Sequence, residues 1–218
     1  MVKQGFLNLA EDEQSKIIDA ALDEFADKDF ETASLNSIIE IAGISKGSMY
    51  HYFASKEDLY LHLISEIMKT KEKFLKHKLA ASEKPLSEMS FFENLEFQML
   101  ASVDFAAQHH REHQLSIRLQ SMTEGPLKER LLGDLTGAFE DYVENMVDEA
   151  MKTGEIREDF DKGFVMRILK FTLMHFVDIY PDSKDLVATD SKALKEEARK
   201  LSAFIRKGLQ KDNRKEES

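Results

Sequence analysis

Proline occurs only three times in the 218 residues, at positions 85, 126 and 181. Because proline ends or kinks a helix, the long stretches between these positions can form continuous helices. Residues that favour tight turns and strands are also scarce: the chain has nine glycines and seven residues each of valine and threonine. A β-sandwich or a barrel needs many turns and β-branched strands. The sequence therefore predicts an all-α fold.

Apolar residues repeat at spacings of three and four through most of the chain, as they do on amphipathic helices. Capping residues predict where the first four helices start: Asn8 (with Glu11 as its capping-box partner), Ser34, Ser45 and Ser55. Gly43 and Gly154 are expected helix ends. Further helices are predicted over residues 88–109, 113–122, 127–152, 161–180 and 191–210.

Several classes of protein are excluded by what the chain lacks. With no cysteine it has no disulfide framework, no thiolate metal site and no thiol nucleophile. Charges interrupt every apolar run well short of the roughly 18 residues that a transmembrane helix needs. The first residues have neither the apolar stretch nor the cleavage site of a signal peptide. We therefore expect a cytoplasmic protein.

Charge is unevenly distributed along the chain, whose formal net charge is −11. Residues 1–84 hold 11 basic and 15 acidic side chains, residues 85–191 hold 10 and 21, and residues 192–218 hold nine and five. Residues 41–56 contain two lysines and no acid. The net charge alone argues against a nucleic-acid partner, whereas this local window permits one.

Residues 35–53, LNSIIEIAGISKGSMYHYF, have the pattern of two short helices that cross at a tight turn. Gly43 stands in the predicted turn, where glycine relieves the steric cost of a positive φ. Apolar residues are placed to lock the two helices together: Ile38, Ala42, Ile44, Met49 and Tyr52. The second helix would then present small and hydrogen-bonding residues to a major groove. The alternative is an ordinary helical hairpin in a globular core.

The stretch from residue 10 to 60 resembles the N-terminal DNA-binding domain of the TetR family of bacterial transcriptional regulators. The most specific part is GISKGSMYHYF, residues 43–53, followed by SKEDL, residues 55–59. Two residues depart from the family pattern: Asp29 stands where glycine is usual, and Ile39 stands where many such motifs have alanine.

This resemblance implies two domains. A three-helix helix-turn-helix domain would cover residues 1–55, and a helical regulatory domain that binds ligand and dimerises would cover residues 56–218.

Roles for individual residues follow from the same resemblance. Lys46, Ser48 and His51 would face the groove, while the two tyrosines nearby would reach the sugar-phosphate backbone. Lys56 would bind a phosphate, and Ser34 would offer a hydroxyl and a helix N-terminus to another. The predicted DNA contacts are Ser34, Ser45, Lys46, Gly47, Ser48, Tyr50, His51, Tyr52 and Lys56. Since this segment has no arginine, bidentate guanine readout falls to Lys46 alone, and we expect dependence on two half-sites.

The middle of the chain is rich in phenylalanine and methionine. Most of these residues fit a plain core, but some could line a cavity, because both types adapt to varied apolar ligands. The predicted effector residues are Phe92, Glu96, Met99, Met122, Phe139, Tyr142 and Phe171. Glu96 and Asp104 support a pocket, because a purely structural core helix does not need acids among apolar neighbours. The alternative, which we favour for each acid taken alone, is that it reaches solvent or faces a partner.

Two late segments predict a homodimer. Residues 162–180 are apolar around most of the helix circumference, and residues 191–210 carry one apolar stripe. One chain cannot easily bury both, so we expect them to form a four-helix interface with their symmetry mates. The alternative is that both pack inside the monomer.

Residues 109–113 spell H-x-x-E-H, a zinc-peptidase arrangement in which His109 and His113 would share a helix face. A third ligand is not recognisable, so we expect a polar cluster at a helix junction, no metal and no cofactor. No phosphate-binding or nucleophile motif is present either. The sequence favours a ligand-responsive repressor, not an enzyme, released from a palindromic operator by a small apolar effector. The alternative is a helical ligand-binding or protein-interaction module with a vestigial DNA-binding domain.

Overall fold

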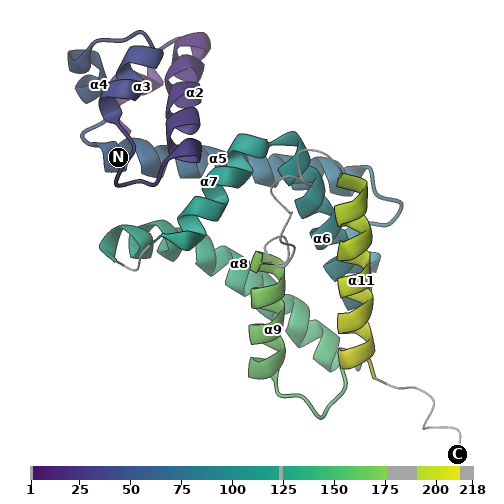
Figure 1. Cartoon of the computed structure of the whole chain (residues 1–218). Coiled ribbons are helices and arrows are strands. Elements are labelled where there is room, and N and C mark those ends of the chain that lie inside the picture. The colour runs from purple at the N-terminus through teal and green to yellow at the C-terminus, as the bar shows by residue number, and fades with distance from the viewer. Residues whose placement is uncertain (1, 123–124, 176–190, 212–218) are drawn as a thin grey trace, which may run out of the picture. The chain divides into compact units, whose positions relative to one another are not determined.

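The structure is a computed structural model that describes residues 2–122, 125–175 and 191–211. Across these residues it consists of helices, turns and two isolated backbone bridges, with no strand (Figure 1). The prediction of an all-α fold is confirmed. The helices are α1 (Gln4–Leu7), α2 (Glu11–Asp27), α3 (Leu35–Ile41), α4 (Lys46–Tyr52), α5 (Lys56–Ala80), a 3₁₀ turn (Leu86–Glu88), α6 (Phe91–Gln108), α7 (His110–Ser121), α8 (Pro126–Lys152), α9 (Lys162–His175) and α11 (Ser191–Leu209).

Serine side chains start three of these helices as predicted. The Ser34 Oγ accepts from the Ser37 N–H at 3.3 Å, and the Ser45 Oγ accepts from the Ser48 N–H at 3.0 Å. Each hydroxyl satisfies a backbone donor that has no partner inside the helix. Ser55 does the same at the start of α5, where its Oγ accepts from a backbone N–H at 3.1 Å. The two predicted glycine stops both have positive φ, 67° at Gly43 and 74° at Gly154.

The predicted cap at Asn8 is wrong. Asn8 ends the short helix α1, and α2 starts at Glu11 with Ala10 as its N-cap. A carboxylate oxygen of Glu13 lies 3.4 Å from the Ala10 N–H, so the acid three residues after the cap does satisfy a backbone donor. The helix over residues 4–7 had no counterpart in the sequence analysis.

Packing divides the chain into two compact units. The first unit comprises Met1–Phe74 and His109–Gly133, and the second comprises Leu75–Gln108 and Asp134–Ser218. This division differs from a boundary at residue 55: the first unit includes most of α5, all of α7 and the start of α8. Helices α5 and α8 each contribute residues to both units.

The first unit has an aromatic core around α2, α4 and α5. Phe25 and Tyr60 are buried and meet edge to face, with ring centroids 4.8 Å apart. Ile38 of α3 and Met49 of α4 are also fully buried, so the two short helices are held by apolar contacts. Helix α7 packs along α2.

The second unit buries one apolar cluster contributed by α6, α8, α9 and α11. Its fully buried members include Leu95 and Met99 of α6, Val143 of α8, Val165 of α9 and Leu194 of α11. Helix α11 packs along α6. Among the described helices, none combines the length and apolarity needed to cross a membrane.

Candidate nucleic-acid interface

The α3–turn–α4 segment forms the predicted helix-turn-helix. Gly43 turns the chain with its N–H donating to the Glu40 carbonyl at 3.1 Å, and the Ile44 N–H donates to the Ile39 carbonyl at 3.2 Å. Because Ile38 and Met49 are buried between the helices, the opposite side of α4 is left to solvent. That side presents Ser45, Lys46, Gly47, Ser48 and Tyr50, of which Ser48 is half-buried and the others exposed.

The two serines at the start of α4 are bound to each other. Their Oγ atoms lie 2.9 Å apart, in addition to the capping bond from the Ser48 N–H. Lys46 lies between them in sequence and is exposed, and no acid occurs within α4. The exposed face of α4 therefore carries one lysine among small hydroxyl residues, a surface that permits close approach to base edges.

A buried acid holds the start of α3. Glu24 is 5% exposed, and its carboxylate accepts from the Ser34 N–H at 2.7 Å, the Ser37 hydroxyl at 3.0 Å and the Lys28 ammonium at 2.9 Å. Burial by itself raises the pKa of Glu24, but these hydrogen bonds outweigh it and lower the pKa below its usual value. The Ser34 N–H is thus used inside the protein, and the predicted phosphate contact of Ser34 stays a prediction.

Lys56 is engaged inside the protein, and its predicted phosphate contact stays a prediction. Its ammonium donates to three backbone carbonyls, those of Phe30 at 2.5 Å, Ala33 at 2.9 Å and Glu31 at 3.3 Å. It also lies 4.6 Å from the centre of the Phe30 ring. Since an ammonium has three protons, a phosphate contact would have to displace one of these carbonyls. The structure gives Lys56 the role of fixing the loop between α2 and α3.

Tyr50, His51 and Tyr52, at the end of α4, differ in exposure. Tyr50 is 45% exposed, as its predicted role requires. Tyr52 is half-buried, with its ring 6.2 Å from that of Phe6. Less of its side chain is therefore exposed for the predicted contact with the sugar-phosphate backbone of DNA. His51 is exposed, and its imidazole lies against Gly5 of α1.

Two arginines of α7 bind α2, a contact that the sequence analysis missed. Arg118 donates to the carbonyls of Ala26 at 2.7 Å and Asp27 at 2.5 Å, and to the Asp29 carboxylate at 2.9 Å. Arg111 pairs with Asp19 and Asp23 at 2.9 and 2.8 Å. The two arginines are seven residues apart and so share one helix face, which was the signal available in the sequence.

The predicted effector residues do not form one set. Phe92 and Met99 are buried in the core of the second unit, and Tyr142 packs against that core. The Tyr142 hydroxyl donates to Asn94 Oδ1 at 2.8 Å and accepts from Gln98 Nε2 at 3.0 Å. Met122 belongs to the first unit, Phe171 is 61% exposed, and the side chain of Phe139 lies outside what the structure describes.

The acids of α6 pair with basic residues, so they give no support to a pocket. Asp104 accepts from Lys78 at 2.6 Å and also pairs with Lys195 of α11. Burial alone raises the pKa of Asp104, but these two ammonium groups lower it below its usual value. Glu96 lies 4.0 Å from Arg199, also on α11. The expectation that a structural helix would not need these acids is wrong, because they pair α6 with its neighbour.

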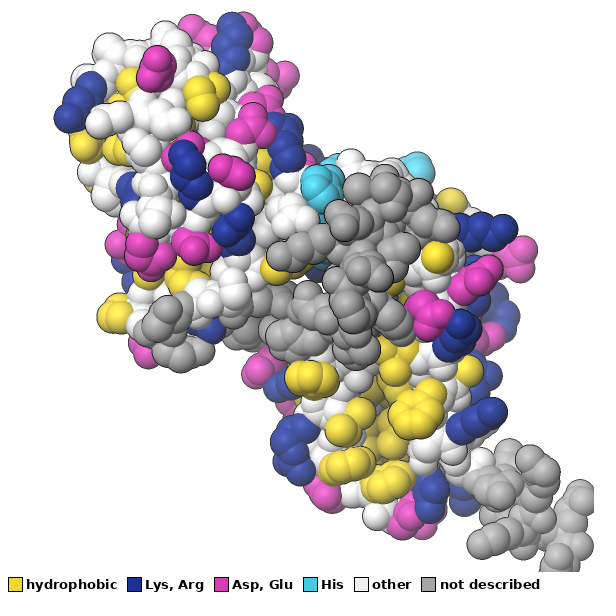
Figure 2. Space-filling model, in the orientation of Figure 1, with side chains coloured by type: hydrophobic (Ala, Val, Ile, Leu, Met, Phe, Trp, Pro, Cys, Tyr) yellow, Lys and Arg dark blue, Asp and Glu magenta, His cyan; other side chains and the backbone are white. Residues whose placement is uncertain are grey.

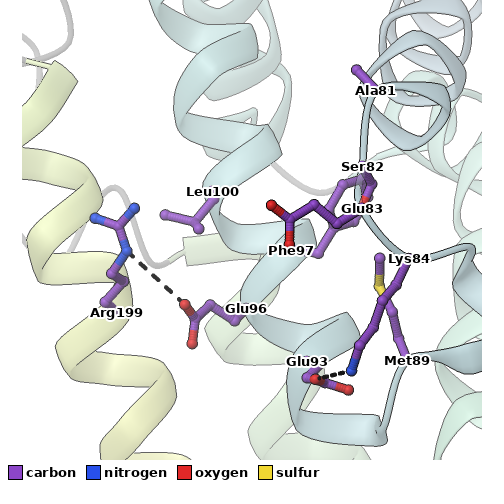
Figure 3. A pocket seen from close by; sticks show the side chains of 10 residues that line it. All are labelled: Ala81, Ser82, Glu83, Lys84, Met89, Glu93, Glu96, Phe97, Leu100 and Arg199. Carbon is purple, nitrogen blue, oxygen red and sulfur yellow. Dashed lines mark hydrogen bonds and ion pairs between the residues drawn. The ribbon is translucent and has the colours of Figure 1, made fainter.

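Glu96 does line an open groove of about 850 Å³ in the second unit (Figure 3). Phe97 and Leu100 of α6 and Met89 supply apolar surface, and Arg199 enters from α11. The Lys84–Glu93 ion pair, at 2.7 Å, closes one end. The groove carries charges of both signs, and its residue Leu100 also packs against the buried cluster that contains Met99.

A face of the second unit carries exposed apolar side chains. Figure 2 shows them gathered over the region of α9 and α11. The large ones are Phe164, Ile168 and Phe171 of α9 and Phe204 of α11, with Phe204 75% exposed. Residues 176–180 of the predicted dimer segment lie outside the described residues.

The H-x-x-E-H run forms a junction between helices. His109 Nδ1 lies 3.4 Å from a Glu112 carboxylate oxygen, and its ring meets Phe74 edge to face. Among the described residues, no group of three or more His, Cys, Asp or Glu side chains is arranged to hold a metal ion.

The family profile described as bacterial regulatory proteins, tetR family, matches residues 17–63, which run from α2 through the helix-turn-helix into α5. The chain belongs to the TetR family. It is therefore a transcriptional regulator with a helix-turn-helix DNA-binding domain, and its relatives are regulators rather than enzymes.

Relatives of this TetR-family chain extend well past the motif. The fatty acid metabolism regulator protein of Bacillus subtilis (strain 168) is 26% identical over 188 residues, which is 82% of this chain and 90% of that protein. The regulator UidR of Escherichia coli (strain K12) is 26% identical over 163 residues, or 73% of this chain and 77% of that protein.

Solved structures agree on the TetR-family fold. A TetR family transcriptional regulator from Chloroflexus aurantiacus J-10-FL superposes with a TM-score of 0.77 at 25% identity, covering 97% of this chain and all of that one. The fatty acid degradation regulator FadR from Bacillus halodurans has a TM-score of 0.65 at 19% identity, covering 90% and 99%.

Proposed function

We propose that this TetR-family regulator is a homodimeric repressor that leaves a palindromic operator when a small apolar effector binds its second unit. The observation that carries the DNA role is the solvent face of α4, where Lys46 stands exposed among Ser45, Gly47 and Ser48 with no acid in the helix. Small residues let the backbone approach the base pairs, and a lysine can bind guanine acceptors. One such lysine per motif gives limited discrimination, so two copies of the motif on one duplex supply the specificity.

The second copy of the motif comes from a second chain, which binds through the apolar face of α9 and α11. Phe164, Ile168 and Phe204 are exposed there, and contiguous exposed apolar side chains mark interaction surfaces. The ion pairs of Lys195 and Arg199 with α6 lie on helix positions that differ from that of Phe204, which leaves the aromatic free to meet a symmetry mate. Phe204→Glu should raise the dimer dissociation constant by at least about tenfold, measured by sedimentation. Lys192→Glu, at an exposed residue on a different face of the same helix, should not raise it.

The effector proposal rests on the core of the second unit. Phe92, Met99 and Tyr142 lie in one cluster, and the polar trio of Tyr142, Asn94 and Gln98 offers hydrogen bonds inside apolar surroundings. A ligand that replaces these hydrogen bonds and displaces the flexible side chain of Met99 could enter the cluster. Two relatives are named for fatty acid metabolism and degradation, which supports an effector with an apolar chain. Because α5 and α8 contribute residues to both units, a shift of either helix in the second unit acts on the first through the chain itself.

The test starts from a random-sequence duplex library incubated with the full-length protein. We expect enrichment of a palindrome, whose complex then dissociates on addition of a neutral, cationic or anionic compound with an acyl chain. Tyr142→Phe should alter the effector concentration needed for release and leave affinity for the palindrome unchanged. If no duplex is enriched, the chain is not a DNA-binding repressor, and a module with a vestigial DNA-binding domain becomes the better account.

A further inference from the structure

The first residues of the chain lie along the end of the recognition helix. We call residues 2–7 the N-terminal strap. Val2 forms an antiparallel bridge with Phe53, and the Lys3 N–H donates to the Tyr52 carbonyl at 2.9 Å. The Lys3 ammonium donates to the Tyr50 carbonyl at 2.8 Å. The last carbonyls of a helix have no donor within the helix, so Lys3 satisfies two of them at the C-terminal end of α4.

Phe6 anchors the strap in the core of the first unit. Its side chain is 1% exposed, and its ring lies 4.9 Å from that of Phe53 and 5.2 Å from that of His62. Phe53 directly follows α4, and His62 lies on α5. The strap is therefore fixed to the protein at Phe6 and holds α4 through Lys3.

Gly5 brings the strap against a side chain of the recognition helix. A Cβ placed on Gly5 would lie 2.5 Å from His51 Nε2 and 2.6 Å from His51 Cδ2, distances that real Cβ contacts do not show. Only glycine therefore lets the imidazole occupy this position. His51 is one of the residues predicted to face the groove, so the strap lies directly beside a side chain with a predicted role in reading DNA.

We infer that the N-terminal strap positions the recognition helix, with Lys3 setting the C-terminal end of α4 and Gly5 setting the imidazole of His51. This inference rests on the proposed function of α4. Lys3 and Gly5 are positioning residues that act on DNA binding through the helix. A strap with this role changes how well the protein distinguishes its preferred duplex from others.

Two other roles for Lys3 have different signatures. A direct phosphate contact would weaken binding to every duplex alike and lower the slope of log affinity against log salt by about one. A purely structural role would lower the melting temperature and leave the relative affinities for two duplexes unchanged. Positioning instead lowers the ratio of affinities for the selected and the scrambled duplex.

The experiment compares four variants of the full-length chain on two duplexes, the palindrome enriched from the random library and its scrambled version, by fluorescence anisotropy. Lys3→Met should weaken binding to the selected duplex by about fivefold, while binding to the scrambled one changes by less than about twofold. Lys3→Arg, which keeps a donor, should restore most of the ratio. Gly5→Ala should also lower the ratio of affinities, because the imidazole of His51 must move. Lys16→Met, at an exposed lysine of α2, is the control and should change the affinity for neither duplex.

Hydrogen exchange in the absence of DNA tests the strap independently. Lys3→Met should speed exchange of the last amides of α4 and of Phe53 by about fivefold, and leave those of α3 as in the wild type. Unchanged exchange in α4, or equal losses on both duplexes, would overturn the inference. If exchange responds as expected but the wild type enriches no duplex, the strap holds the helix and it is the proposed DNA role that fails.

Discussion

Several charged side chains of the first unit bind backbone groups, in addition to the ion pairs found there, whereas several charged side chains of the second unit pair with each other between helices. In the first unit, Lys56 and Arg118 donate to backbone carbonyls, and Glu24 accepts from the N–H of Ser34. In the second, Asp104 pairs with Lys78 and Lys195, and Lys162 pairs with two acids of α8. The second unit also has carboxylates that bind the backbone: Glu155, Glu93 and Asp161 accept from the N–H groups of Phe91, Ser90 and Phe164, each at 2.8 Å.

The difference bears on what each unit does. A backbone carbonyl cannot swing away from its donor, so bonds to it fix the position of a helix end. Exposed ion pairs, such as those of Lys162 with Glu144 and Asp148, can re-form at a neighbouring partner and contribute little net free energy. Under the proposed function, the first unit has to hold α4 in one place, whereas the helices of the second unit have to shift when an effector binds.

The largest expected effect comes from removing the ammonium of Lys56. Lys56→Met leaves the carbonyls of Phe30, Glu31 and Ala33 without their donor, and should lower the free energy of unfolding by about 2–3 kcal/mol. Urea denaturation measures this. Lys69→Met on the same helix, which removes an exposed pair with Glu66, should cost less than about 0.5 kcal/mol. Equal costs for the two would remove the distinction between backbone and side-chain partners.

The two arginines of α7 sharpen the comparison within one helix. Arg118→Met removes two bonds to backbone carbonyls and should destabilise the protein by about 1–2 kcal/mol. Arg111→Met removes only ion pairs with Asp19 and Asp23 on the solvent side and should cost about 0.5 kcal/mol or less. Thermal unfolding of the two variants, compared at one pH and salt concentration, shows which of them loses more stability.

The smallest of these effects is a loss of stability in acid. The pKa of Glu24 is lowered in the folded protein, so its contribution is fully present above the unfolded pKa of about 4.5 and is lost as the pH falls through the folded value. Glu24→Gln should therefore be less stable than the wild type at pH 7, and the difference in free energy of unfolding should shrink as the pH falls through the folded pKa of Glu24. The pKa of Asp104 is also lowered, so Asp104→Asn should behave likewise in the second unit. If the difference in free energy of unfolding between variant and wild type stays constant as the pH falls, the carboxylate charge contributes nothing to stability.

Local sequence patterns predicted the helices and the motif well. Serine caps at 34, 45 and 55 and the positive φ of Gly43 depend on residues within a few positions of one another, and the structure has them as predicted. The buried pair Ile38 and Met49 also follows from helical spacing around the turn.

Contacts between distant segments could not be predicted in the same way. Lys56 meets carbonyls 23 to 26 residues away, and Lys3 meets the Tyr50 carbonyl 47 residues away. Nothing in a single sequence marks which carbonyl a lysine will reach, so Lys56 was predicted to bind phosphate. The partners of Glu96 and Asp104 on α11 were not predicted for the same reason, because they lie about 90 to 100 positions later in the chain.

The most direct test of the central claim, that the solvent face of α4 reads DNA, is the affinity of Lys46→Ala for the enriched palindrome and for single-base variants of it. We expect a loss of about 1–3 kcal/mol on the palindrome and a relaxed preference at one base pair in each half-site. The control is Lys16→Ala, at an exposed lysine of α2, and should bind like the wild type. If Lys46→Ala binds every duplex as the wild type does, α4 is not the element that reads the sequence.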